Sequence, residues 1–332
     1  MLTSAPARTA LWSACVAALL GLPSSAQAQP AARPPLVIVT NGGDATVSIF
    51  DASSAPKLVA TVPVGQEPRE LCVAPDGNHA YILNRADNSI SVIDLASFKA
   101  TATITNPKLK RPEGCAVGAD SKRLYVASAD QDVLLIVGTD NNQVIKDIAV
   151  SKTPRRVVVS PDGKKVYVSS EETGNVQAID AKTDAVIATI KTGNSARNLA
   201  FSQDGKYLLV LHSLQDTVSF LNPETNELVT TIGVGTSPQE VTLTSDGVLA
   251  FVLARGNMAI NVIWTDPVEP RKSFRSVEVE PYPIDMASND RNIYVIHDRA
   301  DTMSVVRVRT LEPFAYQTVK TGKSPQGIAI RR

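Results

Sequence analysis

A single period runs through almost the whole chain, and it constrains the fold more than any other feature. Apolar tetrads of the Tyr-Val type recur at intervals of 42 to 44 residues. The tetrads begin at Ile38, Tyr81, Tyr125, Tyr167, Leu209, Phe251 and Tyr294. The same spacing is kept by turn aspartates at Asp76, Asp120, Asp162, Asp204, Asp246 and Asp290, and by alternating strand signals at Val47, Ile90, Val133, Val176, Val218, Ile260 and Met303. Three marks with one period indicate repeated units, whereas one or two sandwiches would not need equal spacing.

Each repeated unit contains four short strand signals. In residues 153–190, for example, apolar runs are separated by turns rich in Gly, Asp and Asn. Such runs are typical of an antiparallel meander, which alone would be marginally stable in water. A period of about 40–50 residues with four strands is typical of a propeller blade. Seven tetrads therefore predict an all-β, seven-bladed β-propeller of four-stranded antiparallel blades.

The phase of the repeat predicts how the propeller closes. The first repeat begins at a second strand, residues 36–41, and the chain ends on an inner strand alone, residues 327–331. We therefore expect the last blade to combine one C-terminal strand with three N-terminal strands. This closure would remove the open sheet edges that otherwise invite aggregation.

The N-terminal segment has the pattern of a secretory signal peptide. Arg8 precedes an apolar run at 10–22 that is too short to span a bilayer, and Ala26-Gln27-Ala28 forms an A-x-A cleavage site. The predicted divisions are a signal peptide at 1–28, a disordered Pro/Ala-rich leader at 29–35 and a single propeller domain at 36–332. We expect an exported protein, which is periplasmic if the source is Gram-negative.

The overall charge gives no pull toward nucleic acid or membranes. Lys and Arg number 33, and Asp and Glu also number 33, so the formal net charge is zero. Removal of Arg8 with the signal peptide leaves a net charge of −1. A near-neutral chain has no long-range attraction for a polyanion, so such a function would need local segregation of charge.

Two cysteines remain after the leader, Cys72 and Cys115, on the inner strands of neighbouring blades. Cys72 lies four residues before its turn aspartate and Cys115 lies five residues before its own. Because side chains alternate along a strand, the two cysteines point either toward or away from each other. Export permits a disulfide. The geometry required across two blades favours two small buried residues instead.

In an antiparallel four-stranded blade, the loop entering the inner strand and the loop after the second strand lie on one face. The residues just after each recurrent Pro should therefore surround the mouth of the central channel. The first such position gives Arg69, Glu113, Arg155, Arg197, Gln239, Ile284 and Gln326, and the next gives Glu70, Gly114, Arg156, Asn198, Glu240, Asp285 and Gly327. Converging arginines suit a carboxylate or phosphate, because a guanidinium offers planar bidentate donors. The alternative is internal pairing of these charges, for instance Arg69 with Glu113.

The fourth position of each tetrad should lie on the same face, and it contains two of the three histidines, His212 and His297. One interpretation makes them ligands of a metal or haem, or an acid/base pair. The other is turn capping, as Asn does in the same position of other repeats. The chain has no CxxC or CxxCH motif, hydrolase elbow, P-loop or dinucleotide motif.

The tetrad Val39-Thr40-Asn41, the Tyr-Val pairs at Tyr125, Tyr167 and Tyr294, and the Ser160–Gly163 turn resemble the YVTN-type propeller repeat. Over essentially the whole chain after the leader, the sequence is similar to the exported YncE-like family. The resemblance implies a propeller and admits several activities. YVTN-like propellers include periplasmic proteins that bind single-stranded DNA and propellers that capture cobalamin. More distant relatives include haem-binding propellers, lactonases and a streptogramin lyase.

The leading hypothesis is a periplasmic, non-enzymatic binding propeller with Arg69, Arg155, Arg197, His212 and His297 at its ligand site. Candidate ligands are an anionic small molecule, a metal chelate or haem-like cofactor, a partner protein, and, by the resemblance, single-stranded DNA. The alternative is a lactonase-type hydrolase or a lyase that uses a histidine with a carboxylate. A scaffold without a small-molecule site is the third hypothesis, and the fold alone does not choose among them.

Overall fold

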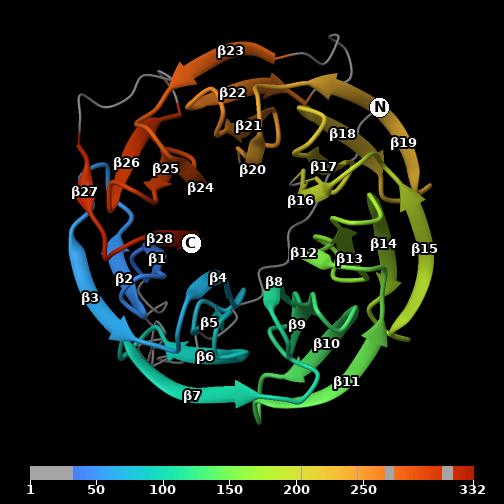
Figure 1. Ribbon diagram of the computed structural model, residues 1–332, viewed down its shortest axis with the longest axis horizontal. Helices are drawn as coiled ribbons and strands as arrows, with labels where there is room; N and C mark the ends of the chain where they lie inside the picture. The colour runs from blue at the N-terminus through green and yellow to red at the C-terminus, as the bar shows by residue number, and fades with distance from the viewer. Residues whose placement is uncertain (1–32, 203, 245, 266–272, 309–316) are drawn as a thin grey trace, which may run out of the picture. The chain divides into compact units, whose positions relative to one another are not determined.

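The computed structural model describes residues 33–202, 204–244, 246–265, 273–308 and 317–332. Within Pro34–Arg332, which form one compact unit, the strands assemble into seven four-stranded antiparallel sheets arranged as blades around a central axis (Figure 1). The prediction of an all-β, seven-bladed propeller is confirmed. The predicted signal peptide and most of the leader lie outside the described residues.

The strands fall into four concentric sets (Figure 1). The inner strands are β4 (Pro68–Val73), β8 (Pro112–Val117), β12 (Pro154–Val159), β16 (Ala196–Phe201), β20 (Pro238–Leu243), β24 (Pro283–Ser288) and β28 (Pro325–Arg331). The second strands are β1 (Leu36–Asn41), β5 (His79–Asn84), β9 (Arg123–Ser128), β13 (Lys165–Ser170), β17 (Leu208–His212), β21 (Leu249–Ala254) and β25 (Asn292–His297). The third strands are β2 (Thr46–Asp51), β6 (Ser89–Asp94), β10 (Val133–Gly138), β14 (Asn175–Asp180), β18 (Thr217–Asn222), β22 (Ala259–Trp264) and β26 (Thr302–Arg307). The outer strands are β3 (Leu58–Pro63), β7 (Lys99–Thr105), β11 (Gln143–Ala149), β15 (Ala185–Lys191), β19 (Glu227–Gly233), β23 (Ser273–Glu278) and β27 (Val319–Lys320).

Blade 1 closes the ring as the phase of the repeat predicts. Its strand order is β28-β1-β2-β3, so the last strand of the chain pairs with the first. The two strands are antiparallel, with Leu36 opposite Arg331 and Thr40 opposite Gly327. Blades 2 to 7 are then the consecutive strand quartets from β4–β7 to β24–β27.

The apolar cores lie between the blades. The tetrad strands are buried on both faces, and seven apolar clusters each combine side chains of two neighbouring blades. In the cluster between blades 2 and 3, Tyr81 and Leu83 pack with Leu124 and Val126. Because each blade contributes to two clusters, each blade needs both neighbouring blades to bury its apolar side chains.

The tetrad tyrosines add a polar link to this packing. The Tyr167 hydroxyl donates a hydrogen bond to the carbonyl of Pro223 in blade 5 at 3.0 Å. The Tyr294 hydroxyl likewise donates to the carbonyl of Ser53 in blade 1 at 3.0 Å. A buried tyrosine needs such a partner for its hydroxyl, so this position fastens one blade to the next.

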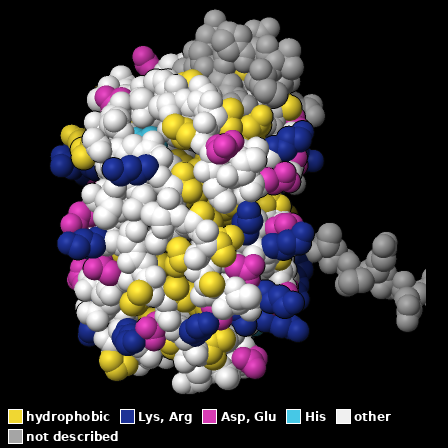
Figure 2. Space-filling view, turned by 90° about the vertical axis from the view of Figure 1, so that its right-hand side faces the viewer, with side chains coloured by type: hydrophobic (Ala, Val, Ile, Leu, Met, Phe, Trp, Pro, Cys, Tyr) yellow, Lys and Arg dark blue, Asp and Glu magenta, His cyan; other side chains and the backbone are white. Residues whose placement is uncertain are grey.

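The side of the propeller carries charges of both signs, interspersed with apolar side chains (Figure 2). Outer strands β15 and β19 lie on this side in Figure 1, and they expose Val186, Ile187, Leu228 and Val229. Interspersed charges produce no broad basic surface on this face. Arginines and carboxylates of several blades come together in the central channel.

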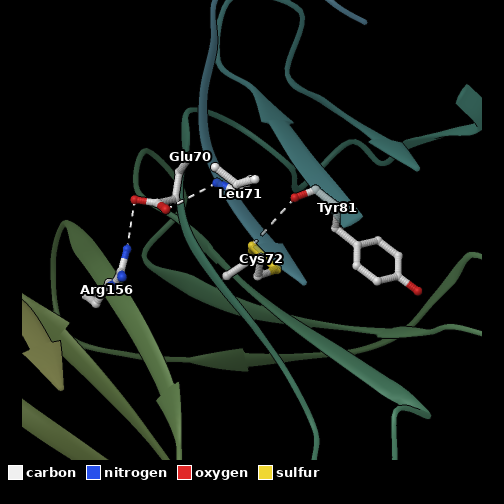
Figure 3. The surroundings of a disulfide bond; sticks show 6 residues. Glu70, Leu71, Cys72, Tyr81 and Arg156 are labelled. Atoms are coloured by element: carbon white, nitrogen blue, oxygen red, sulfur yellow. Dashed lines mark hydrogen bonds and ion pairs between the residues drawn. A yellow bond between two sulfur atoms is a disulfide. The ribbon is translucent and has the colours of Figure 1, made fainter. Parts of the chain in front are cut away.

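Cys72 and Cys115 form a disulfide between inner strands β4 and β8, with their Cα atoms 5.9 Å apart (Figure 3). The interpretation favoured from sequence, two unlinked buried residues, is therefore wrong. Their side chains point toward each other because the two inner strands face each other across the boundary between blades 2 and 3. The bond links the two strands that carry Arg69 and Glu113.

We predict that the double substitution Cys72→Ser/Cys115→Ser lowers the free energy of unfolding by about 2–4 kcal/mol, because the bond restricts the unfolded chain. Urea unfolding with and without a thiol reductant measures the loss. Reduction should destabilise the wild type by the same amount and leave the double variant unchanged. Equal stability of the two proteins under oxidising conditions would contradict the prediction.

Candidate functional site

The turn before every inner strand has the same backbone conformation. The residue before the strand has a left-handed conformation, with φ between 47° and 60°. These residues are Glu67, Arg111, Thr153, Ser195, Ser237, Tyr282 and Ser324. Such φ values are uncommon for residues other than glycine. Their occurrence at one position in all seven blades shows that the turn into the channel is a built feature of the repeat.

Side chains of the preceding blade hold several of these turns. The Asn88 carboxamide oxygen accepts a hydrogen bond from the Arg111 backbone N–H at 2.7 Å. Asp132 accepts from the Thr153 N–H at 2.9 Å. The same contact recurs between blades 5 and 6 and between blades 7 and 1. The start of each of these inner strands is thus fixed to its neighbour.

A bulge follows each turn. The pairing between the inner and the second strand shifts register at this point in all seven blades. A bulge places two consecutive residues of one strand opposite one residue of its partner and turns their side chains from the regular alternation. First- and second-position residues can therefore both face the channel.

These residues line a cavity of about 350 Å³ at the channel mouth. All seven first-position residues line it, as do the second-position residues other than Gly114 and Gly327. The structure thus brings Arg69, Arg155 and Arg197 together, as the sequence indicates. Sequence reasoning missed Arg255 and Asp298, which also line the cavity; the signal available was their position directly after the fourth tetrad residue.

The two second-position glycines allow neighbouring inner strands to approach closely. A Cβ atom on Gly114 would collide with the Arg155 carbonyl oxygen, and one on Gly327 would collide with the Arg69 carbonyl oxygen. No side chain fits at either position. Glycine at these positions therefore lets the backbone of two of the three arginines sit against the adjacent strand.

The three arginines share few carboxylates. Arg155 Nη1 lies 2.8 Å from Glu171 and 3.6 Å from Glu113, and Arg197 Nη1 lies 3.6 Å from Glu171. Arg69 is 4.0 Å from Glu67. Internal pairing, the alternative interpretation of the sequence, therefore describes Arg155 well and Arg69 and Arg197 poorly.

The pKa values of the arginines reflect this uneven pairing with carboxylates. Burial, followed by repulsion from Arg155, lowers the pKa of Arg197 to about 10. Burial also lowers the pKa of Arg69, and Arg85 and Arg155 add to the effect against the attraction of Glu113. The guanidinium groups remain charged at neutral pH but repel one another, which is the condition that an anion would relieve.

The second-position residues form the floor of the cavity. Arg156 Nη1 lies 2.9 Å from Glu70 of blade 2, and its Nη2 lies 3.6 Å from Glu240 of blade 6 (Figure 3 shows the first pair). Asn198 Nδ2 donates a hydrogen bond to Glu240 Oε2. Burial lowers the pKa of Arg156, but Glu240 and Glu70 outweigh it and raise the pKa. This cluster ties blades 2, 4, 5 and 6 across the channel.

Asp285 completes the floor. Burial and the neighbouring Glu240 and Glu70 raise its pKa well above the ordinary value. Asp285 accepts hydrogen bonds from the backbone N–H groups of Met286 at 2.8 Å and Ile328 at 3.0 Å. These N–H groups lie on the inner strands, whose free edges face the channel, so the acidic residues also satisfy edge donors.

His212 and His297 lie elsewhere. Both side chains have 0% exposure and do not line the cavity. His212 Nε2 lies 3.0 Å from Ser219 Oγ, and His297 Nε2 lies 2.8 Å from Ser304 Oγ. Burial lowers the pKa of His212 to about 4 and that of His297 in the same direction. The structure therefore does not bring the histidines together with the arginines.

The equivalent position of blades 1 and 2 explains the histidines. Asn41 and Asn84 occupy it and donate hydrogen bonds at 2.9 Å to Ser48 and Ser91 of their third strands. His212 and Ser219 reproduce this contact with the same spacing. Turn capping, the second interpretation of the sequence, is what the contacts show. In the described part of the chain, no group of three or more His, Cys, Asp or Glu side chains is arranged to hold a metal ion.

The fold and the cavity define a seven-bladed β-propeller with an arginine-lined mouth. Residues 27–186 match the family model "Lactonase, 7-bladed beta-propeller", and residues 119–263 match "Cytochrome D1 heme domain". Each match covers less than half of the chain. None of the curated proteins compared with the chain matches it significantly.

Solved structures share the fold. Hydrazine synthase of Kuenenia stuttgartiensis is 20% identical with a TM-score of 0.69, covering 80% of this chain and 95% of that one. The periplasmic gluconolactonase PpgL of Pseudomonas aeruginosa is 18% identical with a TM-score of 0.74, covering 90% and 99%. The dihydro-heme d1 dehydrogenase NirN, in complex with DHE, is 15% identical with a TM-score of 0.66, covering 89% and 74%. At these identities the likeness shows the fold.

Among the described residues, no helix has the length and apolar character needed to cross a membrane.

We predict that His212→Asn keeps the fold and reduces its sensitivity to acid. The folded-state pKa of about 4 lies below the ordinary 6.5, so the unfolded chain binds more protons between these values. Stability is then lost as pH falls through this range. The substitution should remove about 2 kcal/mol of the wild-type loss between about pH 7 and pH 5. Urea unfolding at both pH values tests this, and parallel pH dependences would contradict it.

We also predict that substitutions of two arginines change the stability by unequal amounts. Arg156→Gln should lower the free energy of unfolding by about 3 kcal/mol, because it leaves buried carboxylates without their cation. Arg197→Gln should change it by less than about 1 kcal/mol, because the substitution also removes repulsion. Urea unfolding of both variants at neutral pH makes the comparison. Similar losses in the two variants would show that Arg197 is also a structural ion pair.

Proposed function

We propose that this propeller binds a small anion, a carboxylate or a phosphate, in the arginine-lined cavity. The observation that carries the proposal is the group of three partly buried guanidiniums, Arg69, Arg155 and Arg197, which repel one another and share few carboxylates. Planar bidentate donors match the oxygens of both anions. The partly enclosed position strengthens such contacts relative to those on an open surface.

The shared carboxylates support this reading of the site. Glu113 lies 3.4 Å from Arg85 and 4.0 Å from Arg111 as well as 3.6 Å from Arg155. One buried carboxylate therefore serves three cations. A bound anion would add negative charge beside Arg69 and Arg197, whose nearest carboxylates lie at 4.0 and 3.6 Å.

A haem-like cofactor or metal chelate fits the described residues poorly. The cavity is lined by charged and amide side chains, apart from Ile284, whereas such groups need apolar contacts for their faces. The Nε2 atoms of His212 and His297 contact serines, and neither histidine lines the cavity. We therefore favour a small polar anion. Binding of single-stranded DNA or of a protein remains an expectation from the resemblance to YVTN-type repeats.

Hydrolysis is the alternative function, and the partial match to the lactonase model favours it. The predicted catalytic histidines do not line the cavity, so a hydrolase here would depend on carboxylates such as Glu113 or Asp298. A lactone-opening assay distinguishes the two functions, because a pure binding protein shows no turnover.

Export to the periplasm is part of the proposal. The N-terminal pattern of a signal peptide supports it, and so does the disulfide between Cys72 and Cys115, because such bonds persist in oxidising compartments. The fold neighbour PpgL is itself described as periplasmic.

The decisive variant is Arg69→Gln/Arg155→Gln/Arg197→Gln. We predict that it weakens the binding of citrate or phosphate by about 100-fold or more, because it removes several charged hydrogen bonds. Isothermal titration calorimetry measures the affinity, which should also fall with added salt. The matched control, Lys164→Gln/Lys206→Gln/Arg291→Gln, removes the same charge from exposed sites and should bind within about threefold of wild type. Equal losses in both triple variants would contradict the proposal.

A further inference from the structure

Asp298 gives the arginine-lined cavity a carboxylate that no cation of the described residues balances. It follows the last tetrad residue of blade 7, lines the cavity and is partly exposed. Its backbone N–H donates to the Tyr282 carbonyl at 3.2 Å. Among the described residues, its carboxylate forms no ion pair or hydrogen bond. The next residue, Arg299, instead stacks on the Tyr282 ring, with its guanidinium carbon 4.4 Å from the ring centroid.

Blade 4 shows how the same position is balanced elsewhere in the ring. Glu171 follows the tetrad of blade 4 as Asp298 follows that of blade 7. The Glu171 carboxylate lies 2.8 Å from Arg155, the first-position residue of its own blade, and 3.6 Å from Arg197, that of the next blade. Around Asp298, the corresponding first positions of blades 7 and 1 hold an isoleucine and a glutamine. Blade 7 therefore keeps the carboxylate but not its cations.

Two other charged residues on this side of the cavity have different surroundings. Asp285 is buried at the floor, where it accepts hydrogen bonds from the backbone N–H groups of Met286 and Ile328. Arg255 of blade 6 lines the cavity, but among the described residues it forms no ion pair with Asp298. Asp298 is thus the carboxylate of blade 7 that is available to a ligand.

The unbalanced carboxylate and the arginines lie on different sides of one small cavity. Blade 7 lies across the ring from blades 3 and 4 (Figure 1), so Asp298 and Arg155 line the cavity from opposite directions. A volume of about 350 Å³ is at the lower end of the range for small-molecule sites. One small molecule can therefore contact both sides. The arginines attract a carboxylate, whereas Asp298 attracts a cationic group.

An ammonium group suits Asp298, because it is compact and offers three donors to one carboxylate. From this arrangement we infer that the ligand is a small anion that also carries one ammonium group, the chemistry of an acidic amino acid. Its carboxylates contact the arginines, and its ammonium group donates to Asp298. The inference rests on the proposed anion-binding function and narrows its ligand class.

The test uses L-aspartate and succinate, which differ by one ammonium group, in calorimetric titrations of the full chain after the leader at neutral pH. Wild type should bind L-aspartate about tenfold more tightly than succinate. Asp298→Asn should weaken L-aspartate by about tenfold. The same substitution should leave succinate unchanged or bind it more tightly, because it removes a charge that repels a dicarboxylate. The control Asp290→Asn removes the same charge from an exposed position of blade 7 and should keep the preference.

The outcomes separate the two levels of the argument. Equal affinities of wild type for the two compounds would overturn the ammonium inference and leave anion binding intact. Because this comparison uses the wild type alone, it decides the inference even where a variant fails to fold. Equal weakening of both compounds by Asp298→Asn would mean that Asp298 only supports the structure, which also overturns the inference. Failure of L-aspartate, succinate, citrate and phosphate alike to bind would overturn the proposed function itself.

Discussion

The pairing of the first and last described strands is the constraint on which the rest of the structure depends. β28 and β1 close the ring, so every blade has a neighbour on both sides. Without this pairing, two apolar faces would be open to water, and the cores between blades would lose their continuity. Arg331 adds polar contacts at the closure, since its Nη1 donates to the Leu95 carbonyl at 3.1 Å and its Nη2 to the Pro34 carbonyl at 2.6 Å.

Closure also creates the site. Seven inner strands with seven bulges direct pairs of side chains at one channel mouth, and no single blade could assemble the group. Arg69, Arg155 and Arg197 come from blades 2, 4 and 5, and they converge because the ring is closed. Arg156 of the floor cluster pairs closely with Glu70, whereas Arg69 and Arg197 lie 4.0 and 3.6 Å from their nearest carboxylates. This difference distinguishes the stabilising charges from those available to a ligand.

The fold could be predicted from the sequence because the length and pattern of the repeat indicate the structure of each repeated unit. One period, repeated in the tetrads, the turns and the alternating strands, leaves little freedom, and its phase also predicts the closing strand. The first-position residues could be placed for the same reason. The second-position residues were also placed at the mouth, although strict alternation alone would not turn both Arg155 and Arg156 toward the channel. That depends on the bulge near the start of the inner strand, which only the structure shows.

The directions of individual side chains account for the other differences between the predictions from sequence and the structure. The histidines share a repeat position with asparagines, and only the distances to Ser219 and Ser304 show that each Nε2 atom contacts a serine of its own blade. The pairing of Cys72 with Cys115 depends on the separation of two neighbouring strands, which a period along the chain does not report. Repeats therefore predict where a residue lies better than what it contacts.

The most direct test of the central claim is a crystal structure of the wild-type protein grown with citrate. The account predicts citrate density in the cavity, with carboxylate oxygens in bidentate contact with the guanidiniums of Arg155 and Arg197 and a further contact from Arg69. A cavity that contains only water, with the three arginines turned onto Glu67, Glu113 and Glu171, would contradict it.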